Sequence, residues 1–221
     1  NTIEIIEQTS DGDFHTYYDY NEDNNLVKTT DNQGNITRVT YDQLGRKDSI
    51  DDPDTGITTF TYDAMNNLLT QTDNKNQTIA FQYDEINRLR RKLYPAGAGL
   101  ADIVYNYDEA ASSNGTGRLT SMFDASGKTV IHYDKNGRVL ESKKTIDSTT
   151  YTTQTAYDDW GRTKSVTYPD GEIVRYSYDV NSGLLEHVEG DSVYADNVEY
   201  NAASQMKFIK LGNNTRTDYA Y

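Results

Sequence analysis

The chain has 221 residues, a formal net charge of −14, no cysteine and 19 tyrosines. The lack of cysteine excludes disulfides, cysteine-bound zinc and a thiol nucleophile, and no run approaches the 18 apolar residues that a membrane helix needs. The acidic balance opposes binding to a nucleic-acid backbone. Leucine, isoleucine, valine and phenylalanine together supply only 41 residues, so tyrosine, with its large ring and polar hydroxyl, must supply much of the core.

A tyrosine followed by aspartate or asparagine recurs along the chain at a spacing close to 21 residues. The longer spacings in the middle coincide with insertions at 96–100 and 109–116. A short acidic or amide side chain after the tyrosine can accept a hydrogen bond from the backbone two residues on and so begin a turn. The repeats start at Tyr20, Tyr41, Tyr62, Tyr83, Tyr107, Tyr133, Tyr157, Tyr178 and Tyr200.

Two turns are predicted in each repeat. The fourth residue after the tyrosine tolerates a positive φ in most copies, as at Asn24, Gly45, Asn66, Asn87, Gly137 and Gly161, with Ser182 and Ser204 as weaker candidates. A second turn begins about eleven residues after the tyrosine, at 31–34, 52–56, 124–127 and 168–171. The last of these has Pro169 and Gly171 where a type I turn favours proline and glycine.

Between the turns the polarity alternates with a period of two, which is typical of half-buried strands. The alternation is clear at 79–83, 103–107, 174–178 and 217–221, with tyrosine on the apolar face, and weaker after the tyrosine turns, at 89–93 and 119–123. No helical stripe is present. The sequence predicts an all-β chain with two short strands per repeat. A lone hairpin cannot bury its apolar face, so we expect the hairpins to join in one continuous antiparallel sheet.

The clearest copies of the repeat, at 41–46, 133–138 and 157–162, read Tyr-Asp-x-x-Gly-Arg. This pattern resembles the YD-repeat or Rhs-repeat family, which includes bacterial Rhs proteins, toxin-complex shell proteins and teneurin-like repeats. The resemblance implies a β-hairpin ribbon that coils into a spiral or a segment of a hollow shell. It also implies a secreted or cell-surface bacterial protein. We expect residues 1–221 to be a single YD-repeat array of about nine repeats, and a fragment of a larger protein.

The repeated side chains are interpreted as scaffold, because catalytic residues are not copied once per repeat. We therefore expect no enzyme, no cofactor and no metal site. The structural set is Tyr41, Asp42, Gly45, Arg46, Tyr62, Asp63, Tyr83, Asp84, Arg88, Tyr133, Asp134, Gly137, Arg138, Tyr157, Asp158, Gly161, Arg162, Tyr178 and Asp179.

Few residues outside this set invite a functional interpretation. Trp160 is predicted at a turn tip, where an exposed indole can stack on a ligand. The acidic clusters at 11–13 and 51–54 resemble calcium ligands, but neither fits a known calcium loop, so we interpret them as turn residues. The Asp52-Pro stretch does not match the self-cleavage site of the family's shell proteins.

The leading functional hypothesis is a wall segment that encloses and protects a toxin or effector polypeptide of the same or a partner protein. The alternative is a surface adhesion or carbohydrate-binding module that contacts glycans through Trp160. An enzyme built from acidic residues of several insertions is a third and weaker hypothesis. No nucleic-acid partner and no membrane span are expected.

Overall fold

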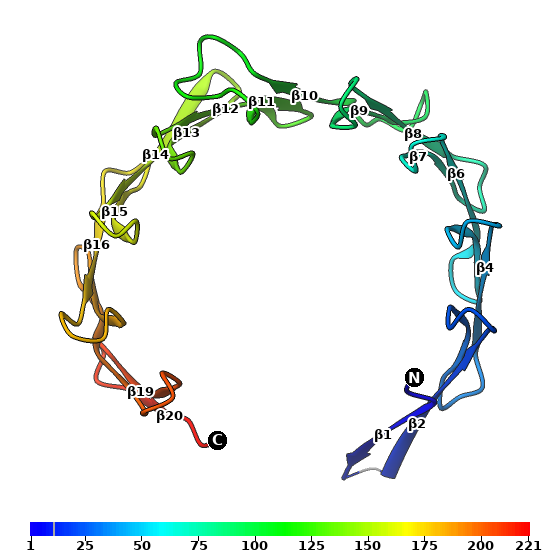
Figure 1. The fold of residues 1–221 in the computed structure, drawn as a ribbon, viewed down its shortest axis with the longest axis horizontal. Coiled ribbons are helices and arrows are strands. Elements are labelled where there is room, and N and C mark those ends of the chain that lie inside the picture. Colours follow the sequence, from blue (N-terminus) through cyan, green and yellow to red (C-terminus); the bar gives the residue numbers. More distant parts are fainter. Residues whose placement is uncertain (11) are drawn as a thin grey trace. The chain divides into compact units, whose positions relative to one another are not determined.

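The structure, a computed structural model, describes residues 1–10 and 12–221. In these residues the backbone forms strands, turns and bends, and no helix is present. A membrane-spanning helix is accordingly not found among them. Strands and tight turns alternate from one end of the chain to the other (Figure 1). The all-β prediction is confirmed.

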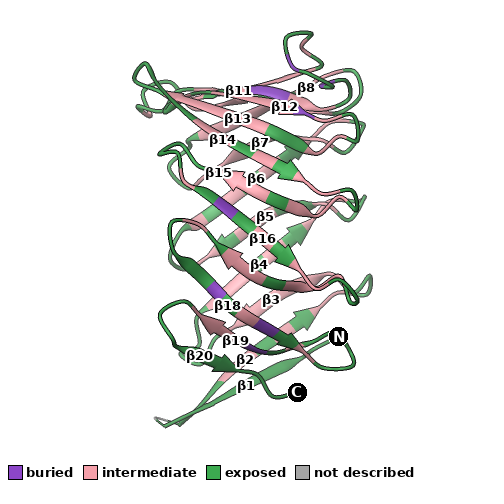
Figure 2. Cartoon of the chain, turned by 90° about the vertical axis from the view of Figure 1, so that its left-hand side faces the viewer, coloured by how far each residue is buried: buried purple, intermediate pink, exposed green. Residues whose placement is uncertain are grey.

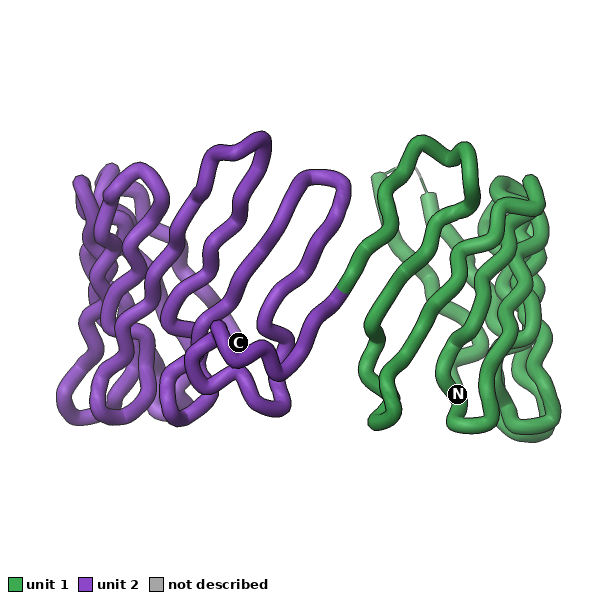
Figure 3. Tube along the Cα trace, turned by 90° about the horizontal axis from the view of Figure 1, so that it is seen from above, with its two compact units in different colours: residues 1–104 green, residues 105–221 purple. Residues whose placement is uncertain are grey.

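The chain divides into two compact units, residues 1–104 and 105–221 (Figure 3). In the first unit, each strand pairs antiparallel with the next one in the sequence. Its strands are β1 Glu4–Thr9, β2 Gly12–Tyr20, β3 Leu26–Thr30, β4 Ile36–Tyr41, β5 Lys47–Asp52, β6 Gly56–Tyr62, β7 Leu68–Thr72, β8 Thr78–Tyr83 and β9 Leu89–Leu93, and β10 Ile103–Tyr107 begins in it.

The second unit repeats this pattern. From β11 onward every strand again pairs antiparallel with its successor. The strands are β11 Leu119–Asp124, β12 Gly127–Tyr133, β13 Val139–Ile146, β14 Thr149–Tyr157, β15 Thr163–Thr167, β16 Ile173–Tyr178, β17 Leu185–Glu189, β18 Val193–Tyr200, β19 Met206–Leu211 and β20 Arg216–Asp218. Two strands per repeat are therefore present, as the sequence predicts.

Most of the tyrosine turns are hairpin loops of three residues. In the loop between β4 and β5, the Gly45 amide donates to the Asp42 carbonyl at 3.0 Å, and the Asp42 amide donates to the Arg46 carbonyl at 2.8 Å. Gly45 has a φ of 75°, the left-handed conformation that ends a type I turn in this loop type. The fourth residue after the tyrosine carries this positive φ at Asn24, Gly45, Asn66, Asn87, Gly137, Gly161 and Ser204.

The prediction for Ser182 was wrong. The left-handed residue there is Gly183, with a φ of 72°, and the loop closes from the Asp179 amide to the Leu184 carbonyl at 2.9 Å. The turn is one residue longer than in the other repeats. Glycine takes the left-handed conformation without steric cost, so it sets the position at which this longer loop closes.

A β-bulge follows each of these turns. Tyr41 faces Lys47 while Thr40 faces Ser49, so Asp48 is an extra residue on β5. The same shift occurs opposite Tyr20, Tyr41, Tyr62, Tyr83, Tyr133, Tyr157, Tyr178 and Tyr200. A bulge switches the face on which the following side chains lie. This explains why alternation is weak at 89–93, where the bulge of β9 falls.

The sheet has a half-buried face, which carries the repeat tyrosines, and a more exposed face. In β16, Val174, Tyr176 and Tyr178 lie on the first, and their neighbours are exposed. Only five apolar side chains are buried within the described residues, and Figure 2 shows buried positions as isolated patches.

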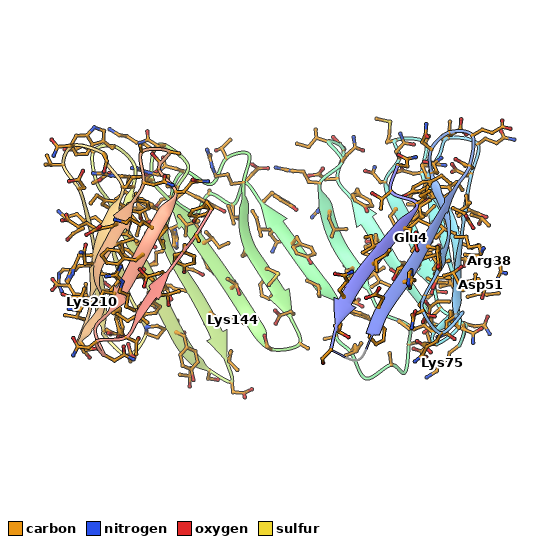
Figure 4. The ribbon with its side chains drawn as sticks, turned by 90° about the horizontal axis from the view of Figure 1, so that it is seen from below. Glu4, Arg38, Asp51, Lys75, Lys144 and Lys210 are labelled. Carbon is orange, nitrogen blue, oxygen red and sulfur yellow. The ribbon has the colours of Figure 1, made fainter. Side chains whose placement is uncertain are left out.

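On the exposed face of the first unit, Arg38 and Asp51 occupy paired positions of β4 and β5 and lie side by side (Figure 4).

The insertion at 109–116 folds back onto β11 and β12. The Ser112 hydroxyl donates to the Ile131 carbonyl, and the Glu109 carboxylate accepts from the Thr120 and Ser121 hydroxyls at 2.8 and 2.6 Å. Thr120 and Ser121 are almost completely buried as a result.

At the other end of this unit, the strand predicted for 217–221 is shorter than expected. The last strand, β20, ends at Asp218.

Gly45 offers a direct test of the turn geometry, because a Cβ at this position would meet no atom within 4 Å. We expect Gly45→Ala to lower the free energy of unfolding by about 1 kcal/mol, the usual cost of a left-handed non-glycine residue. Gly45→Asn is the matched control and should cost much less, since asparagine occupies this position at Asn66. Urea denaturation measures both, and an alanine variant as stable as the parent would contradict the assignment.

Candidate functional site

The repeated turn is held by the aspartate that opens it. The Asp42 Oδ1 atom accepts hydrogen bonds from the amides of Leu44 and Arg46, both at 2.9 Å. Its Oδ2 atom accepts from the Arg46 guanidinium at 2.7 Å. One carboxylate therefore fixes the loop backbone and also orients the arginine that follows the left-handed glycine.

The same arrangement recurs wherever the sequence has aspartate and arginine at these positions. The aspartate Oδ2 accepts from the arginine Nε at 2.6–2.7 Å in the pairs Asp42–Arg46, Asp84–Arg88, Asp134–Arg138 and Asp158–Arg162. Where arginine is missing, another polar group replaces it. The Asn67 side-chain amide donates to the Asp63 carboxylate at 2.9 Å, and the Ser182 hydroxyl donates to Asp179 at 2.7 Å.

The tyrosine hydroxyls connect each repeat to the repeat before it. The Tyr41 hydroxyl donates to the carbonyl of Leu26, the residue that faces Tyr20 across the preceding bulge. Tyr62 likewise reaches Lys47, which faces Tyr41. The bonds run from Tyr41, Tyr62, Tyr83, Tyr133, Tyr157, Tyr178, Tyr200 and Tyr221 to the carbonyls of Leu26, Lys47, Leu68, Leu119, Val139, Thr163, Leu185 and Met206, at 2.7–3.1 Å.

The arginines point forward to the next repeat. The Arg138 guanidinium lies 4.3 Å from the centre of the Tyr157 ring, within range of a cation–π contact. Arg46 over Tyr62, Arg118 over Tyr133 and Arg162 over Tyr178 repeat this contact.

The next turn has room for the guanidinium because it carries a glycine. A Cβ added at Gly161 would lie 3.0 Å from Arg138, and one added at Gly183 would lie 3.3 Å from Arg162. At these positions glycine therefore provides both the left-handed backbone and the space for an arginine of the preceding repeat.

These contacts shift the ionisation of the repeat side chains. The backbone amide of Arg46, and then its guanidinium, hold the pKa of Asp42 below its usual value. The amide side chain of Asn67 lowers the pKa of Asp63. Burial raises the pKa of Tyr62, Tyr83, Tyr133 and Tyr178. The aspartates are thus charged and the tyrosine hydroxyls protonated at neutral pH, as the donor and acceptor roles above require.

Trp160 lies at a turn tip, as predicted, with 81% of its surface exposed. The Arg162 guanidinium lies 4.9 Å from the centre of its ring. The contact described for the Trp160 ring thus comes from Arg162 of the same hairpin. Contact with a ligand remains a prediction.

The acidic clusters have turn roles where they are described. Asp52 accepts hydrogen bonds from the amides of Asp54 and Thr55 at 3.0 and 3.1 Å, within its own turn. Asp11 of the other cluster lies outside the described residues. Elsewhere in the described chain, histidine, aspartate and glutamate form no cluster of three that could hold a metal ion.

Sequence reasoning found the tyrosines, aspartates, glycines and arginines, but it missed three of their connections. It did not identify the carbonyl that each tyrosine hydroxyl reaches, the ring that each arginine covers, or the polar cluster around Glu109. A signal for the first existed, since the alternation weakens at the bulges that present these carbonyls.

Taken together, the turn, the hydroxyl bond and the arginine contact define a scaffold of repeated hairpins, each joined to its neighbours. A sequence model of the RHS repeat family matches residues 20–55 and 157–191. These two segments thus carry the Rhs repeat, and the resemblance to the YD/Rhs family is confirmed. No curated protein matches the chain by sequence.

Solved structures share the fold. A crystal structure of TcdB2-TccC3-Cdc42 superposes with a TM-score of 0.74 at 20% sequence identity, over 100% of this chain and 13% of that chain. TcdB2-TccC3 without its hypervariable C-terminal region gives the same values. A Photorhabdus luminescens Tc holotoxin pore gives 0.74 at 20% identity, over 98% of this chain and 12% of that chain. The chain thus has the fold of a small part of these toxin-complex proteins.

The tyrosine bonds can be tested at Tyr83, whose hydroxyl donates to the Leu68 carbonyl at 3.0 Å. We expect Tyr83→Phe to lower the free energy of unfolding by about 1 kcal/mol, the net value of one such hydrogen bond. Tyr219→Phe is the matched control, because the Tyr219 hydroxyl has no partner in the described part of the chain and should change stability little. Chemical denaturation measures the free energy of unfolding of both variants. If Tyr83→Phe is as stable as the parent chain, the hydroxyl bond contributes nothing to stability.

The chain should lose stability in acid. Hydrogen bonds from Ser126, and then from Lys144, lower the pKa of Asp124 from 3.8 to about 2. A carboxyl with a lowered folded-state pKa stabilises above its unfolded value and loses this contribution as pH falls through the folded one. We expect the urea midpoint to decline between pH 4 and pH 2, and less steeply in Asp124→Asn. If the urea midpoint falls equally steeply with pH in both proteins, the ionisation of Asp124 does not contribute to acid stability.

Proposed function

We propose that this chain is a non-enzymatic wall segment of a β-shell that encloses a toxin or effector polypeptide in a secreted or cell-surface bacterial protein. The observation that carries the proposal is the connection between repeats, in which tyrosine hydroxyls such as those of Tyr41 and Tyr62 bond to the backbone of the preceding repeat. Such links allow a single sheet to extend without a second layer over its face.

The exposure of the sheet supports this role. The side chains of β6 alternate between half-buried and exposed positions, and few residues elsewhere are fully buried. A compact binding domain or enzyme of this length would bury a larger apolar core. A wall, in contrast, needs both faces accessible to solvent or to an enclosed chain.

The relatives by fold support the choice of partner. They include a Tc holotoxin pore, TcdB2-TccC3 without its hypervariable C-terminal region, and TcdB2-TccC3 with Cdc42. This chain spans about an eighth of the length of those chains. An effector polypeptide is therefore the partner class that we propose, within a protein of which this chain forms one stretch of wall.

The test is limited proteolysis of the whole protein that contains this sequence, purified under native conditions, followed by mass spectrometry of what remains associated. We expect a protease-resistant repeat body that retains a separate polypeptide without repeats. The control is the same digestion after unfolding in urea, which should release and degrade that polypeptide. A resistant repeat body that retains nothing would overturn the encapsulation proposal.

A further inference from the structure

A shallow hollow of ≈ 420 Å³ opens on the second unit, lined by Tyr151, Tyr168, Pro169, Asp170 and Glu172. Both tyrosines are partly exposed, at 46% and 40% of their surface. They lie outside the Tyr-Asp-x-x-Gly-Arg pattern, since neither is followed by aspartate. Two aromatic rings and two carboxylates thus line a surface that the repeat itself does not use.

The register places the lining on one face of the sheet. Thr155, Val166 and Val174 are cross-strand partners on β14, β15 and β16, which lie next to one another in Figure 2. Tyr151, Tyr168 and Glu172 are four, two and two residues from these partners. Since side chains an even number of residues apart share a face, all three belong to the half-buried face of the repeat tyrosines.

The carboxylates of the hollow are held in place by neutral groups. Glu172 accepts hydrogen bonds from the Asp191 amide at 3.1 Å and from the Tyr194 hydroxyl. The Asp170 Oδ1 atom accepts from the Glu172 amide at 3.1 Å.

Neither of these two carboxylates has a cationic partner among the residues that the structure describes. Within the described residues neither takes part in an ion pair. Lys144, which faces Tyr151 across the β13–β14 ladder, is bound to both oxygens of Asp124 at 2.9–3.0 Å. A cation in the hollow would therefore have to come from another molecule or another polypeptide segment.

Elsewhere the chain shows what a tyrosine ring beside a carboxylate binds. Arg138 lies over the Tyr157 ring at 4.3 Å while it bonds to Asp134 at 2.6 Å. Arg162 does the same with Tyr178 and Asp158, at 4.2 and 2.7 Å. A guanidinium satisfies both partners because it can stack on the ring and donate to the carboxylate in its plane.

We infer that the hollow binds the cationic side chain, arginine above all, of another polypeptide segment. An open, shallow surface suits one protruding side chain, and the net charge of −14 favours a basic partner. The inference concerns this chain alone and does not depend on the shell proposal, because binding is measured without any enclosed partner.

The test is a titration of the ¹⁵N-labelled chain with N-acetyl-arginine N-methylamide, followed by NMR. Saturable shifts are expected at the amides of residues 151, 168–172 and 191, and they should weaken with added salt. The neutral analogue N-acetyl-citrulline N-methylamide has nearly the same shape and should produce no saturable shift there. A neutral oligosaccharide serves as a second control and should leave the same amides unchanged.

Variants separate the ring from the charge. Tyr151→Ala and Glu172→Gln should each weaken arginine binding by about two- to five-fold, the range of an exposed cation–π or charge contact. Trp160→Ala is the matched control, because this tryptophan is also exposed but already has Arg162 against its ring, and it should not change binding. Amide spectra of each variant establish that the fold is retained.

Three results would overturn the inference. Citrulline binding as strong as arginine binding would exclude recognition of charge. Arginine shifts that leave residues 151 and 168–172 unaffected would place the binding elsewhere. Saturable binding of the oligosaccharide together with none of arginine would assign the hollow to sugars instead.

Discussion

The bond from each tyrosine hydroxyl to the backbone of the preceding repeat is the interaction on which the rest of the structure depends. A β-bulge places the accepting carbonyl, and the bulge lies directly after the turn that the aspartate holds. The turn, the bulge and the hydroxyl bond are therefore coupled. A change in the loop shifts the bulge and so alters the contact with the neighbouring repeat. The recurring spacing inside a repeat reflects this coupling between local geometry and packing.

Arginine adds a second connection in the opposite direction along the chain. The repeat tyrosines reach back to carbonyls, while Arg46, Arg138 and Arg162 reach forward to the ring of the next repeat tyrosine. Arg162 also donates to the Gly183 carbonyl of the next turn at 3.0 Å. Contacts between elements occur only between consecutive strands in the described chain. Stability is thus the sum of repeats and of the links between neighbours, and no central core is required.

Much of the fold could be predicted from the sequence, because a period of two and regularly spaced turn residues determine strands and hairpins locally. Gly45 and Asn66 were identified from their tolerance of a positive φ. Gly183 was not, because a fixed spacing cannot anticipate a loop that is one residue longer. The carbonyl of Leu26 was also missed: weak alternation marks the bulge near it, but which tyrosine hydroxyl reaches it depends on the register across the sheet. The cation-binding hollow was missed for a similar reason, because its two tyrosines are far apart in the sequence and meet only through the pairing of β14 with β15.

The pairing of every strand with its immediate successor has a mechanical consequence. A force applied to one end of either unit loads only the last hairpin, whose hydrogen bonds open one after another as in a zipper. The other hairpins keep their hydrogen bonds until that hairpin has detached. Because the tyrosine of the detached repeat leaves a single carbonyl behind, the newly exposed edge resembles the previous one. Unravelling under tension would therefore proceed in steps of one repeat, and reassembly would follow the same steps in reverse.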